Sequence, residues 1–103
     1  GVEVRELPDV DNPVVTVDTR YPGATPEAVD AEVTSIIEGA VSLVDGVSAI
    51  SSSSSRERSR VVAEFSQSVD IDIAATDVKN AVAAVTGRLP EDVEEPTVVK
   101  ADN

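Results

Sequence analysis

Cysteine and histidine are both absent from this chain of 103 residues, and their absence removes several kinds of chemistry. Without cysteine there is no thiol nucleophile and no thiolate ligand for an iron–sulfur cluster or a structural zinc ion. Without histidine the chain lacks the commonest general base and the commonest metal ligand. Only carboxylates and lysines remain for catalysis, and none of them forms a recognisable constellation. We therefore expect no enzymatic activity, no cofactor and no bound metal ion.

Basic and aromatic residues are scarce. Eight Lys and Arg face 20 Asp and Glu, giving a formal charge of −12, and Tyr21 and Phe65 are the only aromatic residues. Nucleic acids and anionic membrane surfaces attract positively charged proteins, and RNA-binding sheets also need exposed aromatic side chains. The composition therefore argues against nucleic acid as a partner, and it predicts an aliphatic core.

Long apolar runs are also missing. No run approaches the roughly 18 residues that span a bilayer, and no signal peptide is visible, so the composition by itself predicts a soluble chain. The length fits one domain over residues 1–103, with a proline-punctuated leading segment at 1–12 and the folded part at 13–101. Because the chain begins at Gly1 without methionine, we expect it to be an excised piece of a longer protein.

The first half of the chain predicts a strand, a helix and a second strand. Residues 13–20 alternate between two faces, which is typical of a half-buried strand. A turn of proline and glycine follows, and Thr25 can cap the next helix. One apolar stripe runs along that helix at steps of three or four residues: Val29, Val33, Ile36, Ala40 and Val44. Residues 45–46 end the helix, and residues 47–55 form the second predicted strand.

Five consecutive serines occupy residues 51–55, a composition that a flexible linker also has. Their position, in a repeat that needs a strand at this point, favours an extended polar strand instead. Residues 56–59 contain no glycine. We therefore expect the connection to the next strand to be a loop wider than a two-residue primed turn.

The second half of the chain repeats the order of the first. Residues 58–65 alternate again, Asp70 can cap a helix, and residues 97–100 predict a short last strand. The apolar stripe of this second helix consists of Ala74, Val78, Ala81 or Val82, Val85 and Leu89. The two halves together predict an α+β, ferredoxin-like βαββαβ fold, a four-stranded antiparallel sheet with both helices on one face.

A line of small and polar side chains lies opposite the apolar stripe of the second helix. Its members recur at steps of three or four residues: Asp72, Thr76, Asn80, Ala83 and Gly87. A solvated helix face usually carries more Glu, Lys and Arg, and small neutral side chains let another helix approach closely. The spacing leaves two interpretations open, a contact or pore-lining face and an ordinary surface.

Nine short motifs follow one another in register along the chain. They are Leu7-Pro-Asp-Val-Asp11, Pro13-Val-Val-Thr-Val17, Tyr21-Pro-Gly-Ala24, Ile37-Glu38, Asp45-Gly-Val47, Ile50-Ser-Ser-Ser-Ser54, Asp70-Ile-Asp-Ile-Ala74, Leu89-Pro90 and Pro96-Thr-Val-Val-Lys-Ala-Asp102. Together they resemble the resistance–nodulation–division (RND) efflux transporters, in the hydrophobe/amphiphile branch. Within these transporters the chain is similar to the first N-terminal porter subdomain, and the resemblance covers essentially its whole length.

The resemblance implies a periplasmic subdomain of a proton-driven, trimeric multidrug efflux pump of the inner membrane. Its implied partners are sister protomers, neighbouring porter subdomains, an adaptor protein and an outer-membrane channel, and its implied substrates are small amphiphilic compounds. In that family the second helix lines a central pore, here through Asp72, Thr76, Asn80, Ala83 and Gly87. The family's sheet borders the substrate cleft, here through Thr16, Asp18, Arg60, Val62 and Glu64.

Two departures from the family pattern affect these expectations. Many relatives carry neutral polar residues where this chain has Asp18 and Arg60, which either argues against a drug-pocket role for this sheet or points to unusual substrates. Many also carry a glycine near residues 56–59. The alternative function is a free-standing ferredoxin-like module for ligand binding or dimerisation, and the sequence that flanks this chain in its gene distinguishes the two.

Overall fold

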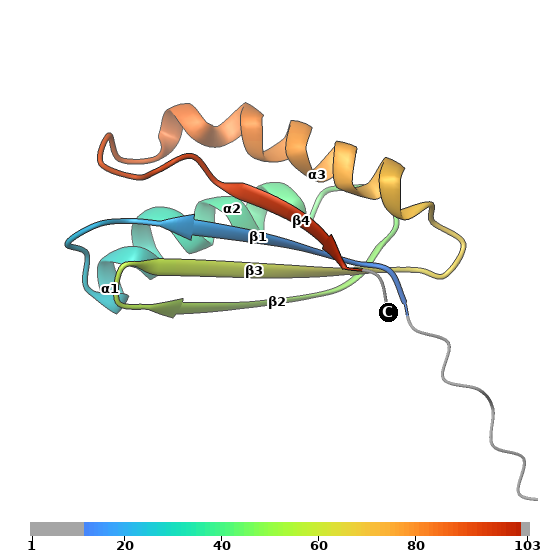
Figure 1. Ribbon diagram of the computed structural model, residues 1–103, viewed down its shortest axis with the longest axis horizontal. Helices are drawn as coiled ribbons and strands as arrows, with labels where there is room; N and C mark the ends of the chain where they lie inside the picture. The colour runs from blue at the N-terminus through green and yellow to red at the C-terminus, as the bar shows by residue number, and fades with distance from the viewer. Residues whose placement is uncertain (1–11, 102–103) are drawn as a thin grey trace, which may run out of the picture.

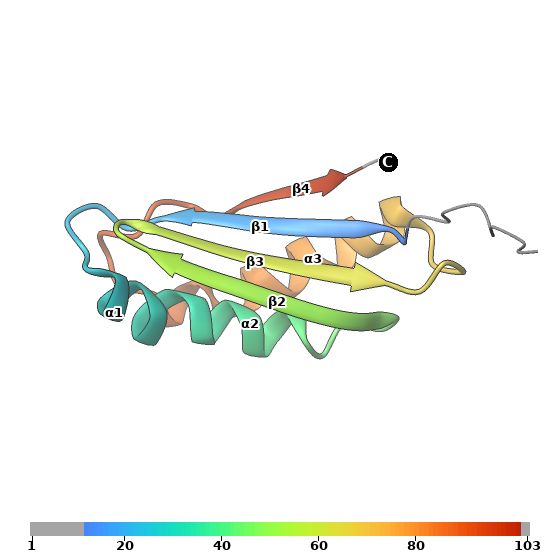
Figure 2. The ribbon, with the colours of Figure 1, turned by 90° about the horizontal axis from the view of Figure 1, so that it is seen from below.

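A four-stranded antiparallel sheet forms one layer of the protein, in a computed structural model that describes residues 12–101. The strands are β1 (Val14–Arg20), β2 (Val47–Ser55), β3 (Arg58–Phe65) and β4 (Thr97–Ala101). They lie in the order β2-β3-β1-β4, as Figure 2 shows, and each pairs antiparallel with its neighbours. This arrangement confirms the predicted ferredoxin-like α+β fold. The leading segment expected at residues 1–12 lies outside the described residues, apart from Asn12.

Two helical segments form the second layer and cover one face of the sheet (Figures 1 and 2). The first consists of α1 (Pro26–Val29), a π-helical turn η1 (Asp30–Thr34) and α2 (Ser35–Val41), and the second of α3 (Ile71–Val85) and a 3₁₀ turn η2 (Thr86–Arg88). Both predicted caps are confirmed. Thr25 Oγ1 accepts a hydrogen bond from Ala28 N at 3.1 Å, and Asp70 Oδ1 accepts from Asp72 N at 2.8 Å. Each cap satisfies backbone donors that the first helical turn leaves unpaired.

The core between the two layers is almost entirely aliphatic. The sheet contributes Val15, Val17, Val61, Ala63 and Phe65, and the second helix contributes Ala74, Ala75, Val78 and Val82. All of these side chains are less than a tenth exposed. The alternation that predicted β1 and β3 therefore identified the faces that the sheet buries.

Two members of the predicted stripe on the first helix, Ile36 and Ala40, are wrong by one residue, whereas Val44 packs against the core as predicted. The fully buried side chains are Val29, Val33, Ile37 and Val41, whereas Ile36 and Ala40 are only half-buried. The cause is η1, in which Ser35 N donates to Asp30 O, five residues back. A π-helical turn contains more residues than an α-helical turn. It therefore keeps residues four apart on one face, where a regular helix would have rotated them away.

The hairpin between β2 and β3 is tighter than expected. Ser55 pairs with Arg58, so the turn contains only Arg56 and Glu57, and the expected wider loop is wrong. Glu57 adopts a φ of 62°, a left-handed conformation that glycine usually supplies. The loop before α1 holds it there, because Glu57 N donates to Ala24 O and Glu57 O accepts from Tyr21 N.

Candidate functional site

The line of small and polar residues on α3 lies on the surface of the described chain. Asp72, Thr76, Asn80, Ala83 and Gly87 are all exposed, and we call them the α3 ridge. They lie opposite the buried Ala74 and Val78 because an α-helix turns by about 100° per residue. A surface of this kind is available to another helix, and whether it lines a pore stays a prediction.

A groove lies between α3 and the edge strand β4, beside the α3 ridge. It consists of two adjoining hollows of about 340 and 390 Å³, which share Lys79 and Val98. Lys100 of β4 forms an ion pair with Asp72 near one end of the groove. The groove lining includes three residues of the ridge: Asp72, Thr76 and Ala83. We call this feature the α3–β4 groove.

The outer face of the sheet brings together the second set of predicted site residues. In the strand register Asp18 lies opposite Arg60, and Thr16 lies opposite Val62. Glu64 accepts a hydrogen bond from Asn12 Nδ2 at 3.0 Å. Since paired residues of neighbouring strands point to the same face, these side chains form one continuous surface.

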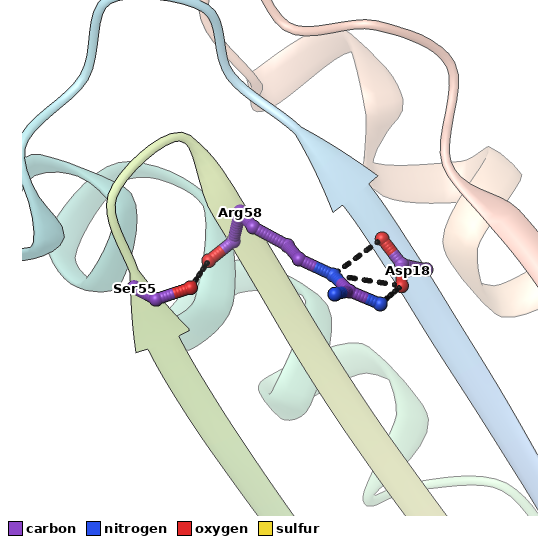
Figure 3. A network of polar contacts seen from close by, with 3 residues as sticks. All are labelled: Asp18, Ser55 and Arg58. Carbon is purple, nitrogen blue, oxygen red and sulfur yellow. Dashed lines mark hydrogen bonds and ion pairs between the residues drawn. The ribbon is translucent and has the colours of Figure 1, made fainter.

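An ion pair that the sequence did not reveal lies on this surface. Arg58 Nη2 lies 2.5 Å from Asp18 Oδ2, and Arg58 Nε donates to the same oxygen at 3.1 Å (Figure 3). The hydrogen bond and the charge of Asp18 raise the pKa of the Arg58 guanidinium. Asp18 therefore pairs with the diagonal neighbour on β3 and not with Arg60, its directly opposite partner. Long side chains can reach diagonal neighbours on the next strand. The Asp18–Arg58 pair could therefore have been predicted only if the register of β1 against β3 had been known.

A chain of hydroxyl groups links β2 and β3 to the first helical segment. Thr34 Oγ1 lies 2.8 Å from Ser59 Oγ and 2.7 Å from Ser54 Oγ. Ser54 Oγ donates to Asp30 Oδ1 at 2.9 Å, and Ser52 Oγ donates to Glu38 Oε2 at 2.5 Å. The serine run is therefore a strand, as predicted, and two of its serines are bound to carboxylates of the helix layer.

Metal and membrane features are not found in the part of the chain that the structure describes. Residues 12–101 contain no group of three His, Cys, Asp or Glu side chains that could hold a metal ion. None of the described helices is both long enough and apolar enough to cross a membrane. The carboxylates that stood out in the sequence have local roles, because Asp70 caps α3 and Asp72 pairs with Lys100.

Known proteins share this chain's sequence over nearly its whole length. A model of the AcrB/AcrD/AcrF family matches residues 2–103. The chain belongs to this RND family. It is also 41% identical, over 98 residues, to the swarming motility protein SwrC of Bacillus subtilis (strain 168). The matched region is 95% of this chain but only 9% of SwrC, so the chain spans a small part of that relative. The family resemblance predicted from the nine motifs is confirmed.

Proposed function

We propose that this chain is a periplasmic porter subdomain of a proton-driven, trimeric multidrug efflux pump. In this proposal it acts by shape and subunit contact, and it catalyses no reaction. The observation that carries the proposal is membership of the RND family over residues 2–103, in a chain that covers 9% of a long relative. The subdomain's partners are sister protomers and neighbouring subdomains, and the complete pump works with an adaptor and an outer-membrane channel.

The α3 ridge is the proposed pore-lining surface. The exposure of all five ridge residues supports this assignment, because a pore surface has to be free of the subdomain's own core. Small side chains also allow three helices to approach one axis. The test places a cysteine at Thr76 or Asn80 in the full-length transporter, in a background without other cysteines. Oxidation should cross-link sister protomers, and an absence of cross-links at both positions would overturn the pore assignment.

The outer face of the sheet is the proposed border of the substrate cleft. Thr16, Asp18, Arg60, Val62 and Glu64 share this face, and the Asp18–Arg58 pair neutralises two of its charges. Arg60 is exposed and has no ion-pair partner among residues 12–101, so its charge is available to a transported compound. We expect Arg60→Ala in the full-length pump to change the relative export of anionic and cationic compounds. Arg88→Ala, in the 3₁₀ turn η2 that follows α3, is the matched control, and equal export profiles for the two variants would contradict the cleft assignment.

The alternative of a free-standing ligand-binding or dimerisation module makes a different prediction about the gene. A porter subdomain requires a reading frame that continues beyond this chain into membrane-spanning segments. A free-standing module requires stop and start signals at its boundaries. Sequencing the flanking DNA decides between the two without any assay on the protein.

A further inference from the structure

The two flanks of α3 on either side of the ridge carry different chemistry. The flank toward β4 carries Lys79 and contributes to the α3–β4 groove. The opposite flank carries Asp77 and Ile73, whose side chain is 60% exposed although it is large and apolar. Asp77 and Lys79 are two residues apart, about 200° around the helix, so they point to opposite sides. One helix therefore has a basic, hollowed side and an acidic side with a protruding apolar residue.

The groove has the composition of a receptor for that second flank. Its walls include the apolar Ala75, Val82 and Val98. Its charged lining residues are Lys79, the ion pair of Lys100 with Asp72, and Glu95, which lines only the hollow that reaches Thr86. Neither Asp77 nor Lys79 has an ion-pair partner within residues 12–101. In the hollow that Asp72 and Thr76 also line, the charge of Lys79 is therefore opposite in sign to that of Asp77 on the other flank of α3.

We propose that the α3–β4 groove binds α3 of a second copy of this chain, with Lys79 of one copy paired to Asp77 of the next. In the same contact, Ile73 of the second copy enters the hollow near Ala75 and Val98. The proposal rests on the trimeric pore proposed above and names the contact that would form it. It is a head-to-tail contact, because each copy contributes one flank of the helix and receives the other.

The positions of these residues along the axis of α3 are compatible with a closed ring of three copies. Copies related by rotation about an axis parallel to α3 are themselves parallel and lie at the same height. Asp77 and Lys79 differ by about 3 Å along the helix at 1.5 Å per residue, so they can meet without any shift. Ile73 lies at the level of the hollow that Asp72, Thr76 and Lys79 surround. The small side chains of the ridge leave room for the helices to approach.

A thiol cross-linking experiment on the full-length transporter tests the contact. Asp77→Cys and Lys79→Cys are introduced together into each copy, in a background without other cysteines, and treated with a short reagent that bridges two thiols. The two positions diverge around one helix, so bridging occurs between copies, and a closed ring should yield covalent trimers. The matched control combines Asp77→Cys with Ala84→Cys, which lie on the same flank and should yield no trimer.

Charge reversal supplies a second readout that does not depend on thiol geometry at the contact. Cross-linking through Thr76→Cys reports whether the helices are close together. Asp77→Lys or Lys79→Asp alone should reduce the yield of the Thr76→Cys cross-link several-fold. The two reversals combined in one chain should restore that yield. A double variant that stays as low as the single variants would overturn the pairing.

The possible outcomes separate this inference from the pore assignment. If Thr76→Cys gives no cross-link between protomers, the pore assignment fails and this contact fails with it. If Thr76→Cys cross-links but the Asp77→Cys and Lys79→Cys pair yields no trimer, the pore assignment survives and the flank contact alone is wrong. A groove occupied by an extended strand added to β4 would give this second result.

Discussion

Glu57 and Gly23 connect two loops that lie 34 residues apart in the chain. The Glu57 carboxylate accepts a hydrogen bond from the backbone N–H of Gly23 at 3.1 Å. Two further backbone hydrogen bonds join the same loops, from Tyr21 N to Glu57 O at 3.0 Å and from Glu57 N to Ala24 O at 3.1 Å. The turn between β2 and β3 is therefore stabilised from outside the hairpin, which explains how it forms without a glycine.

Substitutions at Glu57 should separate the hydrogen bond from the backbone strain. Glu57→Ala keeps the left-handed backbone but loses the bond to Gly23, and should lower the free energy of unfolding by about 0.5–1.5 kcal/mol. Glu57→Gly loses the same bond but relieves a strain of roughly 1 kcal/mol, so its stability should stay close to that of the parent. Urea unfolding of the three proteins measures the difference. A glycine variant less stable than the alanine variant would contradict this account of the turn.

Aspartate substitutions at two positions of α3 test its orientation. Val78 is fully buried, so Val78→Asp places an unpaired charge in the core and should cost at least about 3 kcal/mol. Thr76 is exposed on the ridge, and Thr76→Asp should change stability by no more than about 0.5 kcal/mol. Thermal unfolding followed by circular dichroism compares the two variants. Equal melting temperatures would show that the helix faces are assigned incorrectly.

Thr34 and Ser59 form a buried hydroxyl pair whose coupling can be measured. Both are about 1–2% exposed, so Thr34→Val leaves the Ser59 hydroxyl without its partner at 2.8 Å. An unsatisfied buried hydroxyl costs about 1–3 kcal/mol. Ser59→Ala in the Thr34→Val background should then cost much less than Ser59→Ala alone, because the remaining hydroxyl has already lost its partner. A double-mutant cycle by chemical unfolding measures this, and strictly additive effects would contradict the pairing.

Tyr21 should titrate above its ordinary range. Partial removal from water and the nearby Glu32 carboxylate, 3.4 Å from the phenol oxygen, raise the pKa of Tyr21 above 10.0. The folded state then holds its proton more tightly than the unfolded state. Stability is therefore unaffected by this group below pH 10 and falls as the pH rises through the folded pKa. Tyr21 is the only tyrosine, so its ultraviolet absorbance reports the titration directly. Glu32→Gln should lower the midpoint, and an unchanged midpoint would remove Glu32 as a cause.

The fold was predictable because its signals are local. Alternating β-branched residues placed β1 and β3, and the caps at Thr25 and Asp70 placed the helix starts. The sequence did not predict which residues of the first helix are buried after Val33. That set depends on the π-helical turn, which has no clear amino-acid composition of its own. The tight turn at Glu57 was missed for a related reason. Its three external hydrogen bonds come from a loop that the sequence does not show to be close.

The candidate site was predictable only as far as single elements allow. Helical spacing found the α3 ridge, and strand alternation found the outer face of the sheet. Features that involve two elements were missed. The Asp18–Arg58 pair depends on the register of β1 against β3, and the α3–β4 groove depends on how β4 lies beside α3. Pairing and packing across elements are set by the whole fold, and the periodicity of one segment carries no information about them.

The serines of β2 have a consequence for how the isolated chain behaves in solution. β2 is an edge strand of nine residues without a charged side chain or a proline, the usual protections against adding a foreign strand. Its protection comes from the neighbouring helix layer. There Glu38 and Asp30 accept hydrogen bonds from Ser52 and Ser54, which places two carboxylates beside the unpaired backbone edge of β2. Two carboxylates in these positions repel the same strand of a second copy, and dissolved salt screens that repulsion. Concentrated salt should therefore turn a clear solution turbid, and Glu38→Gln should do so at a lower salt concentration.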